Sequence, residues 1–314
     1  MGTNLDPVAR YARAERQLLD AYGLDATVRD LPVASIGRTH VIEVGEGTPL
    51  VFVQGGGAPG AAWAGLLAGL DGYRRIAVDR PGFGLTPNVP HRRDTLRELA
   101  ATFLGEVLDA LGLDTAVLVA NSMGSWWTTR FAQAHPERVD ALVHVGCPAL
   151  LLDSSAPPPM RLLGVRGLGR LLVAVQRPSR RAARFQLRMS GETLGEGVAD
   201  LALLDVLVAM QHLPDHDAAW HELLHSVIGP RGARPGLSIT ADDLRQLDLP
   251  TLFVWGENDT FGQPEVGQRA TGFAPDAELV VIPHGHVPWV TDPEAVARPI
   301  IAWLADRHEQ HAAE

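Results

Sequence analysis

Lysine is absent from this chain of 314 residues, and all 27 of its basic residues are arginine. The absence excludes enzymes that form a Schiff base through lysine, Walker-type phosphate loops and serine–lysine catalysis, because each of these needs a lysine amine. Cysteine is nearly absent as well. The single Cys147 cannot form a disulfide within the chain, which is typical of a cytoplasmic protein, and we expect that location.

Long hydrophobic runs and an excess of positive charge are also missing. No apolar run reaches the roughly 18 residues that a membrane-spanning helix needs, and residues 1–23 are too charged for a secretory signal. A formal net charge of −10 argues against nucleic acid as a partner. The expected partner is therefore a small-molecule substrate, with no membrane span, and a homodimer is kept as an open alternative.

Alternating strand and helix patterns predict an α/β fold. Apolar, β-branched segments that are candidate strands lie at about 39–44, 50–53, 75–79, 116–120, 141–146, 251–256 and 278–282. Helical patterns lie at about 5–22, 94–111, 123–135 and 293–306. Continuous apolar runs are typical of strands that are buried on both faces, as in a parallel sheet. We expect a doubly wound, mostly parallel sheet of about eight strands.

The alternation breaks between about residues 150 and 245. A proline run at 157–159 comes first, helical stretches without a convincing strand follow, and a loop rich in glycine and proline ends the region. We interpret residues 151–244 as an α-helical cap (lid) that is inserted into a core of residues 1–150 and 245–314.

The predicted cap contains a run of arginines with no acidic residue between positions 154 and 191. Its members are Arg161, Arg166, Arg170, Arg177, Arg180, Arg181, Arg184 and Arg188. The run is interpreted either as a solvated helix face or as a surface that attracts anionic substrates or a partner.

A serine lies on a sharp turn between a predicted strand and a predicted helix. Residues 116–124 read AVLVANSMG, so Ser122 follows an apolar run. Such a turn lifts the hydroxyl clear of the sheet, and only small residues fit two places before and two places after it. Ala120 and Gly124 occupy these places, where the usual pattern is G-x-S-x-G. The pattern predicts that Ser122 is a nucleophile.

A carboxylate and a histidine follow two later strands. Asp259 comes after the run TLFVWG, and His286 comes after ELVVIP. A serine nucleophile needs a base beside its hydroxyl and a group that orients this base. Because the carboxyl ends of parallel strands meet at one edge of the sheet, we expect Ser122, Asp259 and His286 to lie together there.

A glycine-rich loop follows the strand at 50–53, where residues 54–57 read QGGG. Consecutive glycines let a backbone approach a ligand closely, and hydrolysis through a serine needs N–H donors aimed at the developing oxyanion. We expect the N–H of Gly56 or Gly57 to be one donor and that of Met123 to be the other. The residues expected in the substrate pocket are Gln54, Asn121 and Val287.

These segments, in this order, resemble the α/β-hydrolase superfamily. Two further segments match: residues 79–84, DRPGFG, resemble its D-x-x-G-x-G loop, and residues 134–139, AHPERV, resemble the stretch after its nucleophile helix. The resemblance covers essentially everything outside the cap. The superfamily's oxyanion loop usually begins with His-Gly, whereas this chain has Gln54 there, and we expect its amide to brace the loop by hydrogen bonding.

Several residues compete for these roles. Glu257 and Asp153 are alternatives to Asp259, and His284 is an alternative to His286, although the spacing typical of the family favours the first choices. Residues 221–225 read HELLH, which matches the H-E-x-x-H motif of zinc peptidases. No third ligand stands at the spacing those enzymes use, so we interpret the segment as an amphipathic cap helix. With no nucleotide-binding glycine motif either, we expect no metal and no cofactor.

The resemblance leaves two reactions open. In the first, Ser122 attacks a carboxylic ester of a small or medium apolar substrate, His286 takes its proton, Asp259 orients the imidazole and water hydrolyses the acyl-enzyme. In the second, the same residues cleave a C–C bond in a vinylogous diketone acid. Residues 55–63, GGGAPGAAW, and the NSMG turn resemble the meta-cleavage-product hydrolases, which carry out that reaction and hold the substrate carboxylate partly through a cap arginine.

The ester reaction is the first choice because of one departure from that group. The meta-cleavage-product hydrolases usually have tryptophan directly after the catalytic histidine, whereas this chain has Val287, and Trp289 follows two places on. A third interpretation, a small-molecule receptor with the hydrolase fold, would be favoured by loss of a triad residue, and none is lost.

Overall fold

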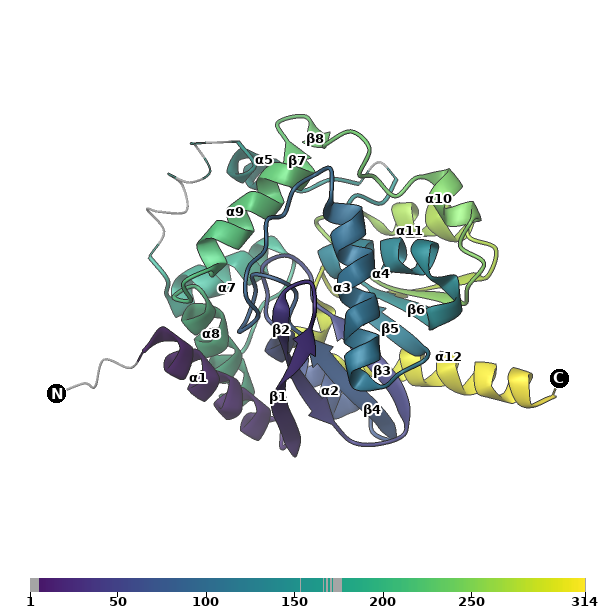
Figure 1. The fold of residues 1–314 in the computed structure, drawn as a ribbon, viewed down its shortest axis with the longest axis horizontal. Coiled ribbons are helices and arrows are strands. Elements are labelled where there is room, and N and C mark those ends of the chain that lie inside the picture. Colours follow the sequence, from purple (N-terminus) through teal and green to yellow (C-terminus); the bar gives the residue numbers. More distant parts are fainter. Residues whose placement is uncertain are drawn as a thin grey trace.

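A computed structural model describes residues 6–152, 154–165, 167, 169, 171 and 177–313. Asp153, Arg166 and Arg170, which were weighed above, lie outside these described residues. Within them, eight strands form one sheet through the middle of the molecule (Figure 1). These strands are β1 (Ala26–Val33), β2 (Gly37–Val44), β3 (Thr48–Val53), β4 (Tyr73–Val78), β5 (Ala116–Ala120), β6 (Val139–Val145), β9 (Thr251–Gly256) and β10 (Ala277–Ile282).

The sheet is mostly parallel, as the sequence predicted. Its strand order is β1-β2-β4-β3-β5-β6-β9-β10, and only β2 pairs antiparallel, with β1 and with β4. The predicted α/β class is confirmed. The strand β1 had not been predicted, because it is an edge strand with polar residues and Pro32, and only Leu31 and Val33 of its side chains are buried.

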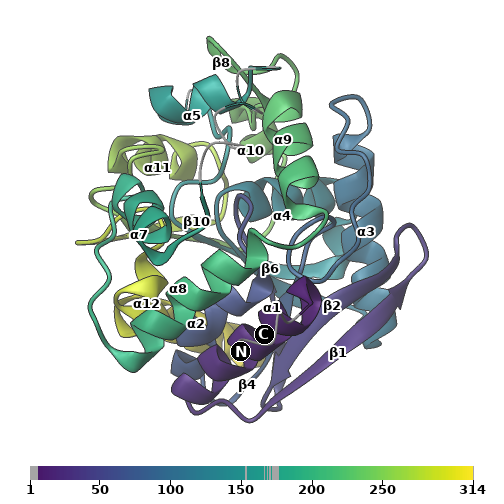
Figure 2. The same ribbon diagram turned by 90° about the vertical axis from the view of Figure 1, so that its left-hand side faces the viewer.

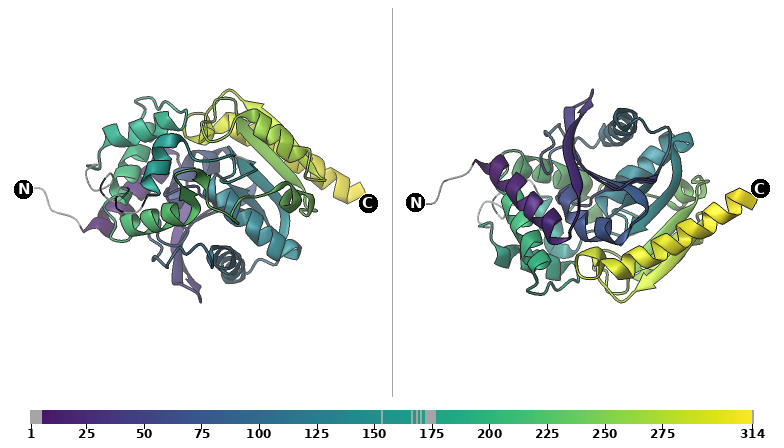
Figure 3. Two further views of the ribbon diagram at one scale, coloured as in Figure 1. Left: turned by 90° about the horizontal axis from the view of Figure 1, so that it is seen from above. Right: turned by 90° about the horizontal axis from the view of Figure 1, so that it is seen from below.

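Helices cover both faces of the sheet, which gives two hydrophobic clusters. Along β5, Leu118 faces one cluster and Val119 the other, as the two-residue period of a strand requires. The first cluster includes residues of α3 (Leu96–Leu111), α4 (Met123–Ala134) and α11 (Pro264–Thr271). The second includes residues of α1 (Pro7–Ala21), α2 (Ala64–Gly69) and α12 (Pro293–Ala313). Figure 3 shows the sheet between the blue α3 and the yellow α12.

The chain between β6 and β9 is helical, as the sequence indicated. It contains α5 (Pro158–Leu163), α7 (Arg180–Met189), α8 (Val198–Met210), α9 (His216–Val227) and α10 (Ala241–Arg245). A short hairpin of β7 (Ile228–Gly229) and β8 (Gly232–Ala233), which had not been expected, follows α9. Short 3-10 turns elsewhere in the chain lie at Gly60–Trp63, Pro136–Arg138 and Pro288–Val290.

This insertion packs against both sides of the molecule. Helix α8 lies along the N-terminal helix α1 (Figure 2), and both contribute to the second cluster. Helix α9 buries Leu223 and Leu224 in the first cluster, beside α3 and α4. None of the described helices combines the length and the apolar character that crossing a membrane requires.

Burial of His144 on β6 makes the stability of the folded protein depend on pH. Its ring lies beside the tilted ring of Phe253, with 5.1 Å between ring centroids, and burial lowers its pKa to about 3. The unfolded chain keeps the ordinary histidine pKa near 6.5, so it binds the proton first as the pH falls. The stability that His144 contributes is therefore complete above about pH 6.5 and is lost as the pH falls toward 3. Burial likewise lowers the pKa of His91 to about 3 and that of His216 to about 4.

We expect replacement of His144 by leucine to reduce this acid sensitivity. Between about pH 7.5 and pH 5, one such histidine removes about 2 kcal/mol from the free energy of unfolding, and the variant should lose that much less than the wild type. Urea unfolding at both pH values measures the difference, because the other titrating groups are shared and cancel. Equal losses in the two proteins would contradict the burial of a neutral His144.

Candidate active site

Ser122 lies between β5 and α4 in a strained backbone conformation. Its φ of 51° and ψ of −115° are rare for a residue with a side chain and occur where a tight turn over-determines the backbone. Two residues later, Gly124 approaches β3 so closely that a Cβ atom would overlap the carbonyl oxygen of Val53. Ala120 is fully buried at the end of β5. The packing therefore explains the glycine two places after the serine.

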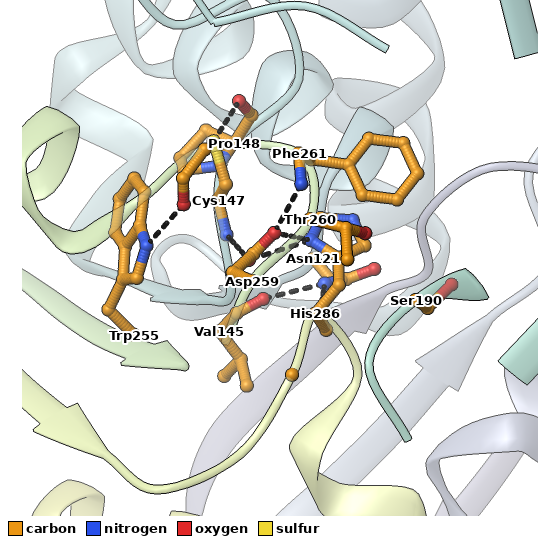
Figure 4. A network of polar contacts seen from close by, with 12 residues as sticks. Asn121, Val145, Cys147, Pro148, Ser190, Trp255, Asp259, Thr260, Phe261 and His286 are labelled. Atoms are coloured by element: carbon orange, nitrogen blue, oxygen red, sulfur yellow. Dashed lines mark hydrogen bonds and ion pairs between the residues drawn. The ribbon is translucent and has the colours of Figure 1, made fainter. Parts of the chain in front are cut away.

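Asp259 and His286 form a buried pair at the ends of β9 and β10 (Figure 4). Nδ1 of His286 lies 2.8 Å from Oδ2 and 3.0 Å from Oδ1 of the carboxylate. The same carboxylate accepts hydrogen bonds from the backbone N–H groups of Cys147 and Phe261, each at 2.8 Å. Because Nδ1–H donates to Asp259, Nε2 of His286 is left as a proton acceptor, and it has no hydrogen-bond partner among the described residues.

Asn121 connects this pair to the serine turn. Its side-chain amide donates to the carbonyl oxygens of Val145, at 2.7 Å, and of His286, at 3.0 Å. The ring of Phe261 stacks on the His286 imidazole with 4.0 Å between centroids. Since Asn121 directly precedes Ser122, these contacts bring the backbones of the serine and the histidine to the same edge of the sheet.

The competing residues lie apart from this arrangement. The side chain of Glu257 is exposed, and Nε2 of His284 lies 3.6 Å from Oδ2 of Asp292. In the H-E-x-x-H segment, Glu222 accepts the His91 N–H at 3.4 Å, and Nδ1 of His225 lies 3.2 Å from the carbonyl oxygen of Gly164. Through these contacts the segment binds neighbouring parts of the chain.

An apolar cavity opens beside Ser122. Its floor comes from the loops after β3, β5, β6 and β9, and its roof from the insertion. The roof side chains include Met160, Trp220, Leu223, Leu224 and Val227. No charged residue is among the described residues that line it, and the polar side chains in its wall are the hydroxyls of Ser122, Ser154 and Ser155.

The expected oxyanion donors differ in whether they line the cavity. Gly56 and Met123 line the cavity beside Ser122, whereas Gly57 lies outside its wall, close to Trp220 and Phe83. Met123 is the first residue of α4, so its N–H has no partner within the helix. The first turn of a helix also carries partial positive charge, which favours an anion.

The residues that were expected in the substrate pocket do not line this cavity. Asn121 is occupied by the two carbonyl groups described above, and Val287 packs against the second hydrophobic cluster. Gln54 is buried, and neither its amide oxygen nor its amide nitrogen has a hydrogen-bond partner in the described part of the chain. The expectation that its amide braces the glycine loop is wrong.

Arg80 braces that loop instead, a role that the sequence analysis missed. Its fully buried guanidinium donates to the carbonyl oxygen of Gln54 at 2.9 Å and to that of Gly56. The group also lies over the rings of Phe83 and Trp127, at 5.0 and 5.3 Å. Burial lowers the pKa of Arg80 to about 9, although the negative charge of Asp79 acts to raise it. Arg80 lies in the DRPGFG segment, but it occupies an unspecified position of the D-x-x-G-x-G pattern, so the pattern did not single it out.

The predicted arginine run does not reach the cavity within the described residues. Arg180 pairs with Asp205 at 2.5 Å, and Arg184 pairs with Glu196 at 3.0 Å. Arg161 donates to the carbonyl oxygen of Ala156 at 2.7 Å. The remaining described members, Arg177, Arg181 and Arg188, are exposed. For these residues the interpretation as a solvated surface fits the structure.

Comparison with known proteins identifies the fold family of this chain and several related proteins. The family model described as "alpha/beta hydrolase fold" matches residues 48–293. A 2-hydroxy-6-oxononadienedioate/2-hydroxy-6-oxononatrienedioate hydrolase of Pseudomonas sp. is 31% identical over 255 residues, which cover 78% of this chain and 83% of the relative. A 2-hydroxy-6-oxo-6-phenylhexa-2,4-dienoate hydrolase of Burkholderia cepacia is 28% identical over 258 residues, 79% of this chain and 85% of the relative.

Solved structures show the same fold at lower sequence identity. A carboxylesterase from Bacillus subtilis superimposes with a TM-score of 0.73 at 23% identity and covers 96% of this chain and 99% of its own. A 2-hydroxy-6-oxo-6-phenylhexa-2,4-dienoate hydrolase from Rhodococcus sp. strain RHA1 gives a TM-score of 0.72 at 19% identity, with 90% and 99% coverage. A carboxylesterase and a hydrolase of a 2-hydroxy-6-oxo-dienoate are thus both represented among proteins of this architecture.

We expect replacement of Arg80 by methionine to destabilise the protein. Methionine keeps much of the aliphatic volume but leaves the carbonyl groups of Gln54 and Gly56 without their donor, which should lower the free energy of unfolding by about 1–3 kcal/mol. Urea unfolding measures the loss. Arg92, which is exposed and pairs with Asp94, provides the control, and its replacement by methionine should cost less than about 0.5 kcal/mol. Equal effects at the two positions would contradict the bracing role.

Proposed function

The chain belongs to the alpha/beta hydrolase fold family and is a hydrolase of that fold, and on this premise we propose that it cleaves carboxylic esters of small or medium apolar substrates through Ser122. The observation that carries the proposal is the cavity beside Ser122. Its wall is apolar, and none of the described residues in it is charged. An uncharged acyl chain can therefore enter the cavity without burying a polar group that lacks a hydrogen-bond partner.

The proposed reaction uses Ser122, Gly56 and Met123 of the cavity floor together with the buried Asp259–His286 pair. Oγ of Ser122 attacks the ester carbonyl carbon while Nε2 of His286 accepts the hydroxyl proton. Asp259 holds the imidazole by Nδ1 and stabilises its charged form. The N–H groups of Gly56 and Met123 donate to the oxyanion. His286 then returns the proton to the departing alcohol oxygen, which leaves an acyl-enzyme.

A water molecule completes the proposed cycle. His286 takes a proton from the water, whose oxygen attacks the acyl carbon, and the Ser122 oxygen leaves with that proton to release the acid. Trp220 and Leu223 of α9 roof the cavity, so residues 151–244 would act as a cap over a core of residues 1–150 and 245–314. A homodimer and a cytoplasmic location remain predictions from the sequence.

C–C bond hydrolysis is the second candidate, because the curated relatives named above are hydrolases of 2-hydroxy-6-oxo acids. Such substrates carry carboxylates, and none of the described arginines lines the cavity. Val287 replaces the usual tryptophan after the histidine. Trp289 does not substitute for it, since its ring stacks on Trp63 at 4.0 Å and its N–H donates to Ala62 in the core. The ester reaction therefore ranks first.

Replacement of Ser122 by alanine should abolish turnover and leave the fold intact. The alanine lacks the hydroxyl that attacks the substrate, and removal of a triad nucleophile reduces kcat by a factor on the order of 10⁶ in a comparable hydrolase. We would compare both proteins on a chain-length series of p-nitrophenyl esters and on a 2-hydroxy-6-oxo-dienoate, with circular dichroism as the control for folding.

The pattern across substrates distinguishes the two candidates. Serine-dependent ester cleavage far above dienoate cleavage supports the proposal and measures the acyl length that the cavity accepts. Dominant dienoate cleavage makes the chain a C–C hydrolase. Turnover by the alanine variant at the wild-type rate would reject Ser122 as the nucleophile.

A further inference from the structure

A turn of the insertion covers the loops that carry Asp259 and His286. Residues 189–192 end helix α7 and contact both loops. The carbonyl oxygen of Ser190 accepts the backbone N–H of His286 at 2.7 Å, and that of Met189 accepts the Thr260 hydroxyl at 2.9 Å. Figure 4 shows Ser190 next to His286. The insertion thus contacts the backbone of the proposed base as well as roofing the cavity.

Glu192 anchors this turn to the histidine loop. Its carboxylate accepts the Gly285 N–H through Oε1, at 2.6 Å, and the Thr291 hydroxyl through Oε2, also at 2.6 Å. Its own N–H donates to the carbonyl oxygen of Leu187, which ties it to the last turn of α7. One side chain therefore bridges the residue before His286, a residue shortly after it and the insertion.

The chemistry of Glu192 is unusual for a merely structural position. The residue is buried, and no cation pairs with it among the described residues. A buried carboxylate without a counter-charge is costly, so it needs strong hydrogen bonds to remain there. Its two donors, Gly285 and Thr291, both belong to the segment that carries His286.

The turn and the loop also interlock sterically. A Cβ atom at Gly285 would overlap the carbonyl oxygen of Ser190, so the close approach depends on glycine at that position. The His286 backbone is then held from two sides, since Asn121 of the serine turn binds its carbonyl oxygen and Ser190 binds its N–H. The position of the imidazole relative to Ser122 depends on both contacts.

We propose that Glu192 is a positioning residue, which seats the turn 189–192 against Gly285 and thereby aligns His286 with Ser122. The proposal rests on the assignment of His286 as the base in the function proposed above. In this arrangement the seating of α7 controls catalysis, because the turn that ends the helix supplies both the Ser190 carbonyl and the Glu192 carboxylate.

The test compares Glu192→Ala with Glu192→Gln. Alanine removes both acceptors, so kcat should fall at least about tenfold, while KM should change less than about threefold because Glu192 does not line the cavity. Glutamine can accept the Gly285 N–H with its amide oxygen and donate to the Thr291 hydroxyl with its amide nitrogen. It should keep kcat within about threefold of the wild type.

Two measurements separate positioning from loss of folded protein. The first is kcat per active site, with sites counted by complete labelling of Ser122 with a fluorophosphonate. The second is the rate of that labelling, which depends on His286 as the base and on no choice of substrate. Both should fall in Glu192→Ala and recover in Glu192→Gln. Glu196→Ala is the matched control, since Glu196 is an exposed carboxylate of the same insertion that pairs with Arg184, and this variant should stay within about threefold of the wild type.

A Glu192→Ala protein whose kcat per site and labelling rate stay within threefold of the wild type would overturn the proposal, as would a Glu192→Gln protein as impaired as the alanine variant. If the alanine variant does not fold, Glu192→Asp replaces it, because its shorter side chain keeps the charge but cannot reach both donors. It should lower the labelling rate, and an unchanged rate would overturn the proposal. Failure of the ester function appears separately, as Ser122 labelling without ester turnover.

Discussion

The Asp259 carboxylate is the group on which the geometry of the candidate site depends. It is fully buried, and its oxygens accept from the His286 imidazole and from the backbone N–H groups of Cys147 and Phe261. These donors come from the chain after β10, β6 and β9, so one side chain joins the ends of three neighbouring parallel strands. A carboxylate with three donors has one favourable orientation, and the orientation of the imidazole follows from it.

The insertion between β6 and β9 contributes to the candidate site in two ways, because it roofs the cavity and also contacts the histidine loop. Helix α9 supplies apolar side chains to the cavity, and the turn after α7 contacts the histidine loop through Ser190 and Glu192. The apolar roof and the backbone of the proposed base therefore depend on one segment. Loss of packing in that segment would change substrate binding and proton transfer together.

The polar side chains around the cavity bind backbone carbonyl groups, so they offer few hydrogen-bonding groups to a substrate. Arg80 binds the carbonyl groups of the glycine loop, and Asn121 binds those of Val145 and His286. This use explains why the cavity wall is almost entirely apolar although buried polar residues surround it.

The sequence by itself determined the α/β class, seven of the eight strands of the sheet, the turn that carries Ser122, and the places of Asp259 and His286 after two later strands. Each of these features is encoded locally, in apolar runs and in the residue that follows a strand. The tertiary structure alone decided that Arg80 rather than Gln54 braces the glycine loop, that Gln54, Asn121 and Val287 stay out of the cavity wall, and that Glu192 contacts Gly285. These contacts join residues 26 and 93 positions apart in the chain, and no local pattern encodes them because they depend on how whole segments pack.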